Sequence, residues 1–251
     1  MTHAGAYLLN ADTELISAAD LDADALASFG EKWAVPKTYA DPLVMLDAEP
    51  IDILSICTPT TTHSEIFEAA LGAGTKTIFL EKPISQDPQE AHRMVKLARH
   101  RQVAVNYYRR WNREICSLRD DIHNGDWGEP ISACVRYTKG LWVNGSHFVD
   151  LFRWFFGEPE AVRTLRHHDG PAPDDRGVDF SLSFSNGLTV DFHHLPGAEY
   201  VFLDVEIYFR AGRVAMRQRG QFIETDIATP ELQFGNFDNL GHRGRRETDW
   251  K

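Results

Sequence analysis

The sequence is poor in cysteine and has no long apolar run. Its three cysteines, Cys57, Cys116 and Cys134, are widely spaced, and no CxxC pair occurs. An odd count at such spacing argues against a disulfide framework or a zinc site and favours a reducing compartment. No apolar stretch approaches the roughly 18 residues that a membrane span requires. The opening MTHAGAYLLNADTE also lacks a basic region followed by an apolar core, so we expect no signal peptide and a cytoplasmic protein.

Positive charge is the next scarcity. The chain has 26 Lys and Arg against 37 Asp and Glu, a net charge of −11, so we do not expect a general nucleic-acid or membrane surface. The short basic cluster GHRGRRE near the end is interpreted as a solvated tail, because charge runs usually face water. What is present is ordinary for a globular protein. Of the 251 residues 43% are hydrophobic, enough for one large or two modest cores.

The first half is organised around Ile51–Pro83. Two apolar runs, IDILSIC and TIFL, flank SEIFEAALGAGT, which is long enough for one helix. Thr62 and Glu65 have the spacing of a capping box at its start, and Gly74 suits its end. Strand, helix and strand in this order, with apolar strands, predict a βαβ unit in a buried parallel sheet.

The same pattern extends on both sides of that unit. Strands are expected at Glu14–Ala19, which ends at Asp20, and at Gln102–Asn106, and Val35–Tyr39 is expected to be a short extended piece. Helices capped by Asp22 and by Asp87 would separate them. The resulting order β-α-β-α-β-α-β predicts an α/β fold with a doubly wound parallel sheet, whose ligands bind outside the carboxyl ends of the strands.

Beyond Asn106 the pattern changes to helices followed by alternating strands. Helices are expected at Arg113–Asn124 and Ser146–Phe156. Apolar and polar residues alternate over 131–137, 178–184, 188–192, 203–209 and 214–216, which predicts a mainly antiparallel sheet. Its apolar face must be covered by the helices or by a second subunit. We therefore expect two domains, residues 1–106 and 107–251.

Several motifs occur in an informative order: a THxxAY-like opening, ILSICTPTTTH, LEKPIS, VNYYRRWN and KGLWVNGSHFVDLFRWFFGEP. Together they resemble the Gfo/Idh/MocA oxidoreductases, up to about Pro159 and more loosely beyond. The resemblance implies a Rossmann domain followed by an α+β domain with a large open sheet. It also implies NAD(P)-dependent chemistry on a secondary alcohol of a sugar, polyol or sugar nucleotide. The partner would be this small molecule, and we expect a homo-oligomer formed through the antiparallel sheet.

One expected motif is missing. A Rossmann domain opens with a strand and a GxGxxG turn that places pyrophosphate at a helix N-terminus, and no GxGxxG occurs here. The ribose-binding acid lies about 20 residues after that motif, and Asp20 matches the acid. We therefore expect an N-terminally truncated Rossmann domain that lacks its central strand. Two interpretations stay open: a damaged or misplaced copy of a dehydrogenase, or a truncated non-catalytic homologue that serves as a binding or assembly protein.

The resemblance assigns roles to individual residues. Lys82 and His147 would handle the proton as hydride moves, and Asp150 could orient either of them. A salt bridge to Glu81 is the structural alternative for Lys82, and a polar cap contact is the alternative for His147. Asp20 would bind the adenosine ribose, and because no arginine follows it closely we expect NAD, with NADP possible. The other cofactor-binding candidates are Thr58, Pro59, His63, Glu81, Lys82 and Pro83. The substrate-binding candidates are Asn106, Arg110, Asn144 and His147.

Further expectations concern the surroundings of these residues. In the family the peptide bond before Pro83 is often cis. Many relatives carry an aspartate four residues before the histidine, but here Val143 stands there, so proton transfer would fall on Lys82 and His147 alone. Asn106, Arg109 and Arg110 could contact an anionic substrate or brace neighbouring acids, and we favour bracing. No metal is predicted, because the adjacent pairs His167-His168 and His193-His194 would point to opposite faces of a strand.

Overall fold

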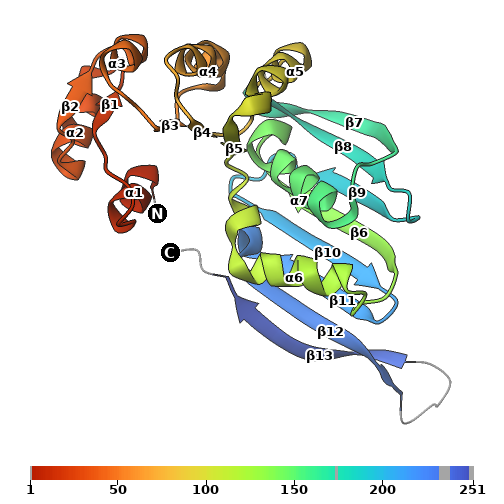
Figure 1. Cartoon of the computed structure of the whole chain (residues 1–251). Coiled ribbons are helices and arrows are strands. Elements are labelled where there is room, and N and C mark those ends of the chain that lie inside the picture. The colour runs from red at the N-terminus through yellow and green to blue at the C-terminus, as the bar shows by residue number, and fades with distance from the viewer. Residues whose placement is uncertain (1, 173–174, 232–237, 249–251) are drawn as a thin grey trace. The chain divides into compact units, whose positions relative to one another are not determined.

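The chain divides into two units after Asn106. The structure, a computed structural model, describes residues 2–172, 175–231 and 238–248 (Figure 1). Met1–Asn106 form the first unit and Tyr107–Lys251 the second. Among the described residues, no helix is long and apolar enough to cross a membrane.

The first unit alternates helices with short parallel strands. In chain order its elements are α1 (His3–Leu9), β1 (Ser17–Ala19), α2 (Ala23–Trp33), β2 (Lys37–Tyr39), α3 (Pro42–Ala48), β3 (Ile53–Ile56), a 3-10 turn (Thr60–Thr62), α4 (His63–Gly72), β4 (Thr77–Leu80), α5 (Pro88–Leu97), a second 3-10 turn (Ala98–His100) and β5 (Gln102–Val105). All strand pairs are parallel, which confirms the predicted class. The described strands form two sheets, β1-β2 and β3-β4-β5, instead of one continuous sheet.

Side-chain caps explain where most of these helices start. The carboxylates of Asp22, Asp41 and Asp87 accept backbone N–H groups at the starts of α2, α3 and α5. The capping box predicted for α4 is wrong. Thr62 already belongs to a 3-10 turn with φ −104° and ψ −3°, and its hydroxyl donates to Pro59 O at 2.9 Å instead of accepting a helix N–H. A cap requires extended backbone at that residue, which the turn denies.

The core of the first unit lies between its larger sheet and helices α3, α4 and α5. Ile56, Ile78 and Leu80 of the strands are at most 2% exposed. They share one buried cluster with Phe67 of α4 and Met94 of α5, both fully buried. Burial of each such side chain contributes about 1.5–3 kcal/mol, so this packing fixes the edge at which β3, β4 and β5 end.

The second unit is a large sheet with two helices on one face. Its elements are a 3-10 turn (Tyr108–Trp111), α6 (Arg113–His123), β6 (Pro130–Tyr137), a π-helical turn (Leu141–Gly145), α7 (Ser146–Phe156), β7 (Ala161–Ala172), β8 (Asp175–Ser183), β9 (Thr189–His194), β10 (Leu203–Phe209), β11 (Gly212–Arg217), a 3-10 turn (Gln218–Gly220), β12 (Phe222–Pro230) and β13 (Asp238–Glu247). The strand order is β13-β12-β11-β10-β6-β9-β8-β7. Every neighbouring pair is antiparallel except β6 and β9, which confirms the mainly antiparallel prediction.

Helices α6 and α7 lie across one face of this sheet (Figure 1). Phe148, Leu151 and Phe152 of α7 are fully buried against the strands. Beneath them Phe180 and Phe192 stack with ring centroids 4.3 Å apart. The alternating apolar residues of the strands therefore face the helices. The sequence left open whether the helices or a second subunit cover this apolar face, and the structure shows that the helices do.

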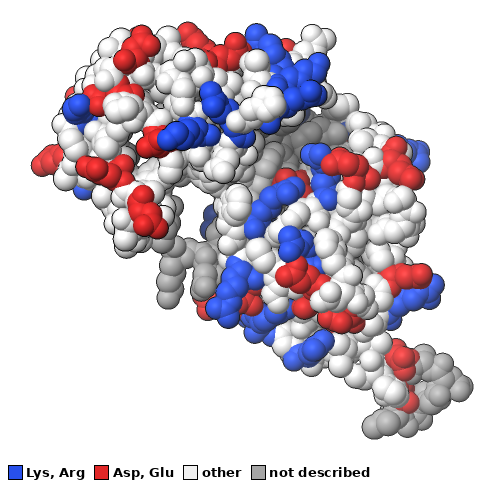
Figure 2. All heavy atoms as spheres, viewed as in Figure 1, with Lys and Arg blue, Asp and Glu red and all other residues white. Residues whose placement is uncertain are grey.

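The opposite face of the sheet is charged. Arg213 and Arg217 both pair with Glu206, and Arg213 also pairs with Asp226. The prediction that the basic cluster GHRGRRE forms a tail is wrong, because these residues belong to the edge strand β13. In this strand Arg246 lies 3.7 Å from a carboxylate oxygen of Glu114. Figure 2 shows the side on which α6 and α7 lie, and acidic and basic side chains are intermixed there.

Candidate active site

Polar side chains follow the three parallel strands of the larger sheet in the first unit. Cys57, Glu81 and Asn106 are the first residues after β3, β4 and β5, so they leave the same edge. Asn106 Nδ2 donates to Glu81 Oε1 at 2.7 Å. Lys82, half-buried, follows at once. Parallel sheets bind ligands beyond this edge, so the structure places the predicted Glu81, Lys82 and Asn106 where such a ligand would lie.

A histidine that no sequence argument singled out joins this edge. His3 of α1 donates through Nε2 to Glu81 Oε1 at 3.1 Å, and its Nδ1 lies 2.9 Å from Ser55 Oγ. The Cys57 thiol, 3.6 Å from Nδ1, and then the Glu81 carboxylate raise the pKa of His3 to about 9. The same contact with His3 holds the pKa of Glu81 below its usual range. Glu81 is therefore an ionised hydrogen-bond acceptor within a network.

His63 connects two of the edge loops. Its Nε2 lies 3.0 Å from Thr58 O and its Nδ1 3.1 Å from Pro83 O, and the residue is 1% exposed. The Lys82–Pro83 peptide bond is cis, as the resemblance implied. Pro59, which is exposed, precedes the 3-10 turn. These contacts give His63 a structural task, and the cofactor role of Thr58, Pro59, His63 and Pro83 stays a prediction.

Asp20 follows β1 and is exposed. Its Oδ1 accepts the N–H of Asp22 at 2.9 Å, and its own N–H donates to Tyr39 O at 3.2 Å. The backbone is thus fixed between β1 and α2, while the carboxylate faces solvent. This is the arrangement that a ribose-binding acid needs, and the assignment stays a prediction.

In the second unit His147 lies in the first turn of α7. It is 7% exposed, and its ring meets those of Tyr108 and Tyr107 edge-on, with centroids 5.0 and 5.9 Å apart. Burial raises the pKa of both tyrosines, and the charge of Asp150 adds to the effect on Tyr107. Both phenols are therefore neutral near His147. The sequence did not single out Tyr107 and Tyr108, since only their place within VNYYRRWN could have drawn attention to them.

Asp150 and Arg110 form a two-pronged ion pair. Arg110 donates through Nε and Nη2 to the two oxygens of Asp150, each at 2.8 Å. The guanidinium also lies over the ring of Trp154, 5.5 Å from its centroid. The pair joins the 3-10 turn Tyr108–Trp111 to α7. This geometry supports the interpretation that Arg110 braces a neighbouring acid. The Asp150 carboxylate, in turn, is engaged in an ion pair that helps to hold α7.

Arg109 is a second brace in the same turn. It is 1% exposed, donates through Nη2 to Arg219 O at 2.8 Å, and lies over the rings of Tyr108 and Phe148. Burial lowers the pKa of Arg109 to about 10. A guanidinium held in this way positions the tyrosine beside His147.

Asn144 is buried in the π-helical turn that precedes α7. Its Nδ2 donates to Thr138 O at 2.7 Å, so the amide nitrogen is used in a hydrogen bond within the protein. A substrate contact by Asn144 stays a prediction, as does one by Asn106 or Arg110. Among the described residues no group of three or more His, Cys, Asp or Glu could hold a metal ion.

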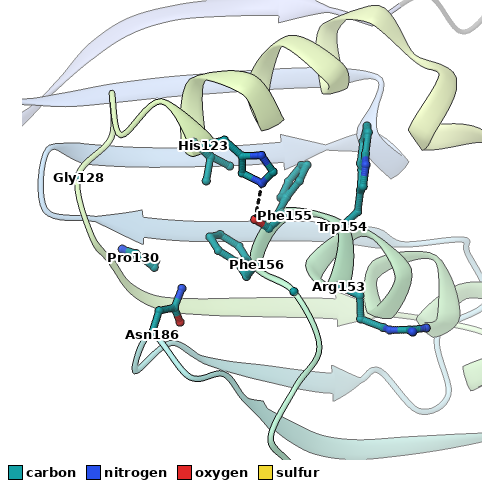
Figure 3. Close-up of a pocket in the computed structure, with 10 residues that line it drawn as sticks. His123, Gly128, Pro130, Arg153, Trp154, Phe155, Phe156 and Asn186 are labelled. Carbon is teal, nitrogen blue, oxygen red and sulfur yellow. Dashed lines mark hydrogen bonds between the residues drawn. The ribbon is translucent and has the colours of Figure 1, made fainter.

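A hollow of about 480 Å³ lies at the other end of α7. Figure 3 shows its lining, with His123 donating to Phe155 O at 2.9 Å and with Trp154, Phe156 and Asn186 around it. No predicted site residue lines it. His147 lies eight residues before Phe155, or about 12 Å along the helix at 1.5 Å per residue. The hollow is therefore separate from the His147 site.

Comparison with known proteins identifies the family. Residues 1–108 match the model described as "Oxidoreductase family, NAD-binding Rossmann fold", GFO_IDH_MocA. The myo-inositol 2-dehydrogenase of Thermotoga maritima is 31% identical over 163 residues, covering 59% of this chain and 48% of that protein. The inositol 2-dehydrogenase of Rhizobium meliloti (strain 1021) is 32% identical over 250 residues, covering 90% of this chain and 74% of that protein. The chain belongs to the Gfo/Idh/MocA family.

Solved structures agree with this assignment at the level of fold. A levoglucosan dehydrogenase solved with NADH and levoglucosan superposes with a TM-score of 0.77 at 20% identity, covering 92% of this chain and 72% of that one. The chain spans about half the length of several of the curated Gfo/Idh/MocA relatives that it matches, between 45% and 53%.

The residues of this Gfo/Idh/MocA chain fit part of an NAD molecule. The exposed carboxylate of Asp20 suits ribose hydroxyls, and the polar edge around Lys82 and Asn106 suits a second polar group. The glycine-rich loop for the pyrophosphate is not among the 251 residues, and α1 begins at His3 behind its cap, Thr2. Asp20 is therefore the candidate for the ribose, and this assignment stays a prediction.

Proposed function

We propose that this chain catalyses the NAD-dependent oxidation, or the reverse reduction, of a secondary alcohol on a polyol or sugar. The supporting observation is its similarity to an inositol 2-dehydrogenase over 90% of its length. Other relatives are named D-glucoside 3-dehydrogenase and D-apiose dehydrogenase, so their substrates also carry secondary alcohols. None of these names supports the non-catalytic alternative. Asp20, with no arginine close behind it, favours NAD over NADP.

In this proposal the bound nicotinamide supplies the hydride acceptor, and the chain supplies the proton chemistry. Lys82 Nζ would bind the hydroxyl, and the His147 imidazole would take its proton as general base. Glu81 is unsuited to proton transfer because His3 and Asn106 already hold its carboxylate. Asp150, engaged with Arg110, would keep α7 in place and so act on His147 indirectly.

The experiment is a panel of polyols and sugars, myo-inositol first, with NADH formation followed by absorbance. Lys82→Ala and His147→Gln should each lower kcat/KM by about 10²- to 10⁴-fold, the range typical for the loss of a general acid or base. Lys76→Ala is the matched control for Lys82, because Lys76 is an exposed lysine of the same unit, paired with Asp52. His123→Gln is the control for His147.

Two results would contradict the proposal. One is a wild-type chain that forms no NADH with any member of the panel. The other is activity that survives Lys82→Ala as well as it survives the Lys76→Ala control, which would remove Lys82 from the chemistry.

We also propose a homo-oligomer formed through the charged face of the large sheet, which α6 and α7 do not cover. Glu206, Arg213 and Arg217 lie in its middle strands. Light scattering should give a mass that is a multiple of the chain mass, and Arg217→Glu should reduce it. A wild-type monomer would contradict this.

We further propose a cytoplasmic location, which the three unpaired cysteines support.

A further inference from the structure

The helix that carries His147 begins in an irregular way. Lys139 has φ 64°, in the left-handed region, and the π-helical turn Leu141–Gly145 then runs directly into α7. The first N–H groups of such a helical segment have no partner within it. Gly140, at the capping position, has no side chain to offer. Some other group must accept these amides.

Asp175, the first residue of β8, accepts hydrogen bonds from two of these amides. Its Oδ1 receives the Trp142 N–H at 2.7 Å and its Oδ2 receives the Val143 N–H at 3.1 Å. The residue is 5% exposed. A carboxylate at the start of a helical segment also lies at the positive end of the helix dipole. Asp175 therefore caps this segment from more than 30 positions away in the sequence.

Gly140 makes room for this cap. A Cβ atom at position 140 would lie 1.9 Å from Asp175 Cγ, so no other residue fits there unless the carboxylate moves. The turn is tied down at further points. Ser146 Oγ donates to Trp142 O at 2.7 Å, and the Thr138 hydroxyl accepts the Phe202 N–H at 2.7 Å. The backbone leading to His147 is thus held by side chains on both sides of the Asp175 contact.

We propose that Asp175 is a positioning residue for the reaction. By capping the segment that starts at Leu141, it fixes where His147 lies between Tyr107 and Tyr108. This inference rests on the proposed function only for its effect on turnover. The placement of the His147 ring is a separate consequence. A misplacement of about 1 Å in a reacting group can cost 10²-fold in rate, so a cap that sets this placement matters to the chemistry.

The test combines nuclear magnetic resonance with kinetics on the full chain. The ring protons of His147 lie against two tyrosine rings, whose ring currents shift their resonances. His147→Gln assigns these resonances. Asp175→Ala should move them toward the positions of an unstructured histidine and lower kcat by about 10- to 100-fold, while the affinity for NAD stays the same. Asp175→Asn keeps one acceptor oxygen and should give intermediate values for both.

Asn112→Ala is the matched control. Asn112 also accepts two backbone N–H groups at a helix start, those of Glu114 and Ile115 in α6, and it belongs to the same unit. This variant should leave the His147 resonances and kcat unchanged. If Asp175→Ala does not fold, judged by circular dichroism, Asp175→Asn carries the test.

The outcomes separate the two proposals. Unchanged His147 resonances in folded Asp175 variants would overturn the positioning role, whatever the activity. Resonances that move in the Asp175 variants but not in Asn112→Ala support the role. If they move while the wild-type chain has no dehydrogenase activity, the positioning role stands and the proposed function falls.

Discussion

The ion pair between Arg110 and Asp150 should make a measurable contribution to the stability of the second unit. The perturbation is a double-mutant cycle with Arg110→Met, Asp150→Asn and both together. Two bonds of 2.8 Å join the groups. Unit charges about 4 Å apart attract by about 4 kcal/mol at an effective dielectric constant near 20. The side chains are 35% and 10% exposed, so desolvation and screening offset part of this. We expect a coupling free energy of about 1.5–3 kcal/mol.

The assay is urea unfolding followed by tryptophan fluorescence. Trp33 is the single tryptophan of the first unit, so emission reports mainly the second. Because Arg110 lies over Trp154, circular dichroism should be recorded as a second probe. With a urea slope of about 1–3 kcal/mol per molar, a change of about 2 kcal/mol moves the midpoint by roughly 1 M.

An exposed pair in the same unit serves as the control for this cycle. Arg210 and Glu129 are also 2.8 Å apart, but their side chains are 72% and 77% exposed. Their coupling should stay below about 0.5 kcal/mol, as for most surface pairs. A coupling between Arg110 and Asp150 as small as that of the control would refute the bracing interpretation.

Three further predictions concern stability. The pKa of His3 is raised from 6.5 to about 9, so between these values the folded state keeps a proton that the unfolded state releases. The contribution of His3 to the unfolding free energy should therefore be complete below pH 6.5 and fall by about 1–2 kcal/mol as the pH rises through 9, after allowance for partial exposure. Urea unfolding at stepped pH should show this slope in the wild type, and its persistence in His3→Gln would contradict the assignment. Gly140→Ala should lower the thermal midpoint, because its Cβ would meet Asp175, and an unchanged midpoint would contradict the close approach. Phe192→Ala should cost about 3–5 kcal/mol in urea unfolding, and a loss below about 1 kcal/mol would show that its stack with Phe180 is not in a packed core.

Local patterns predicted much of the fold. Alternation of apolar and polar residues identified β8, β9 and β10, and their inward side chains are buried beneath α6 and α7. Short signals were less informative. The strand expected at Glu14–Ala19 is only Ser17–Ala19, and α1 was not expected at all, since seven residues show almost no helical period.

The candidate site was predictable where it follows the strand ends and not where distant residues meet. Lys82 and Asn106 were expected because they come directly after apolar strands. His3 and Asp175 could not be found in this way, because each acts on residues 30 or more positions away. Those partners are chosen by tertiary packing, which a single sequence does not display.

The proposed function requires that this chain bind NAD through the carboxyl edge of its parallel strands, with Asp20 on the ribose. Isothermal titration calorimetry with NADH tests it most directly, using the wild type, Asp20→Ala and, as control, the exposed acid in Asp47→Ala. We predict saturable binding at micromolar concentrations, weakened about 10- to 100-fold by Asp20→Ala through the loss of a charge-assisted hydrogen bond, and unchanged in Asp47→Ala. No saturable heat in the wild type, or equal affinities in all three proteins, would contradict the claim.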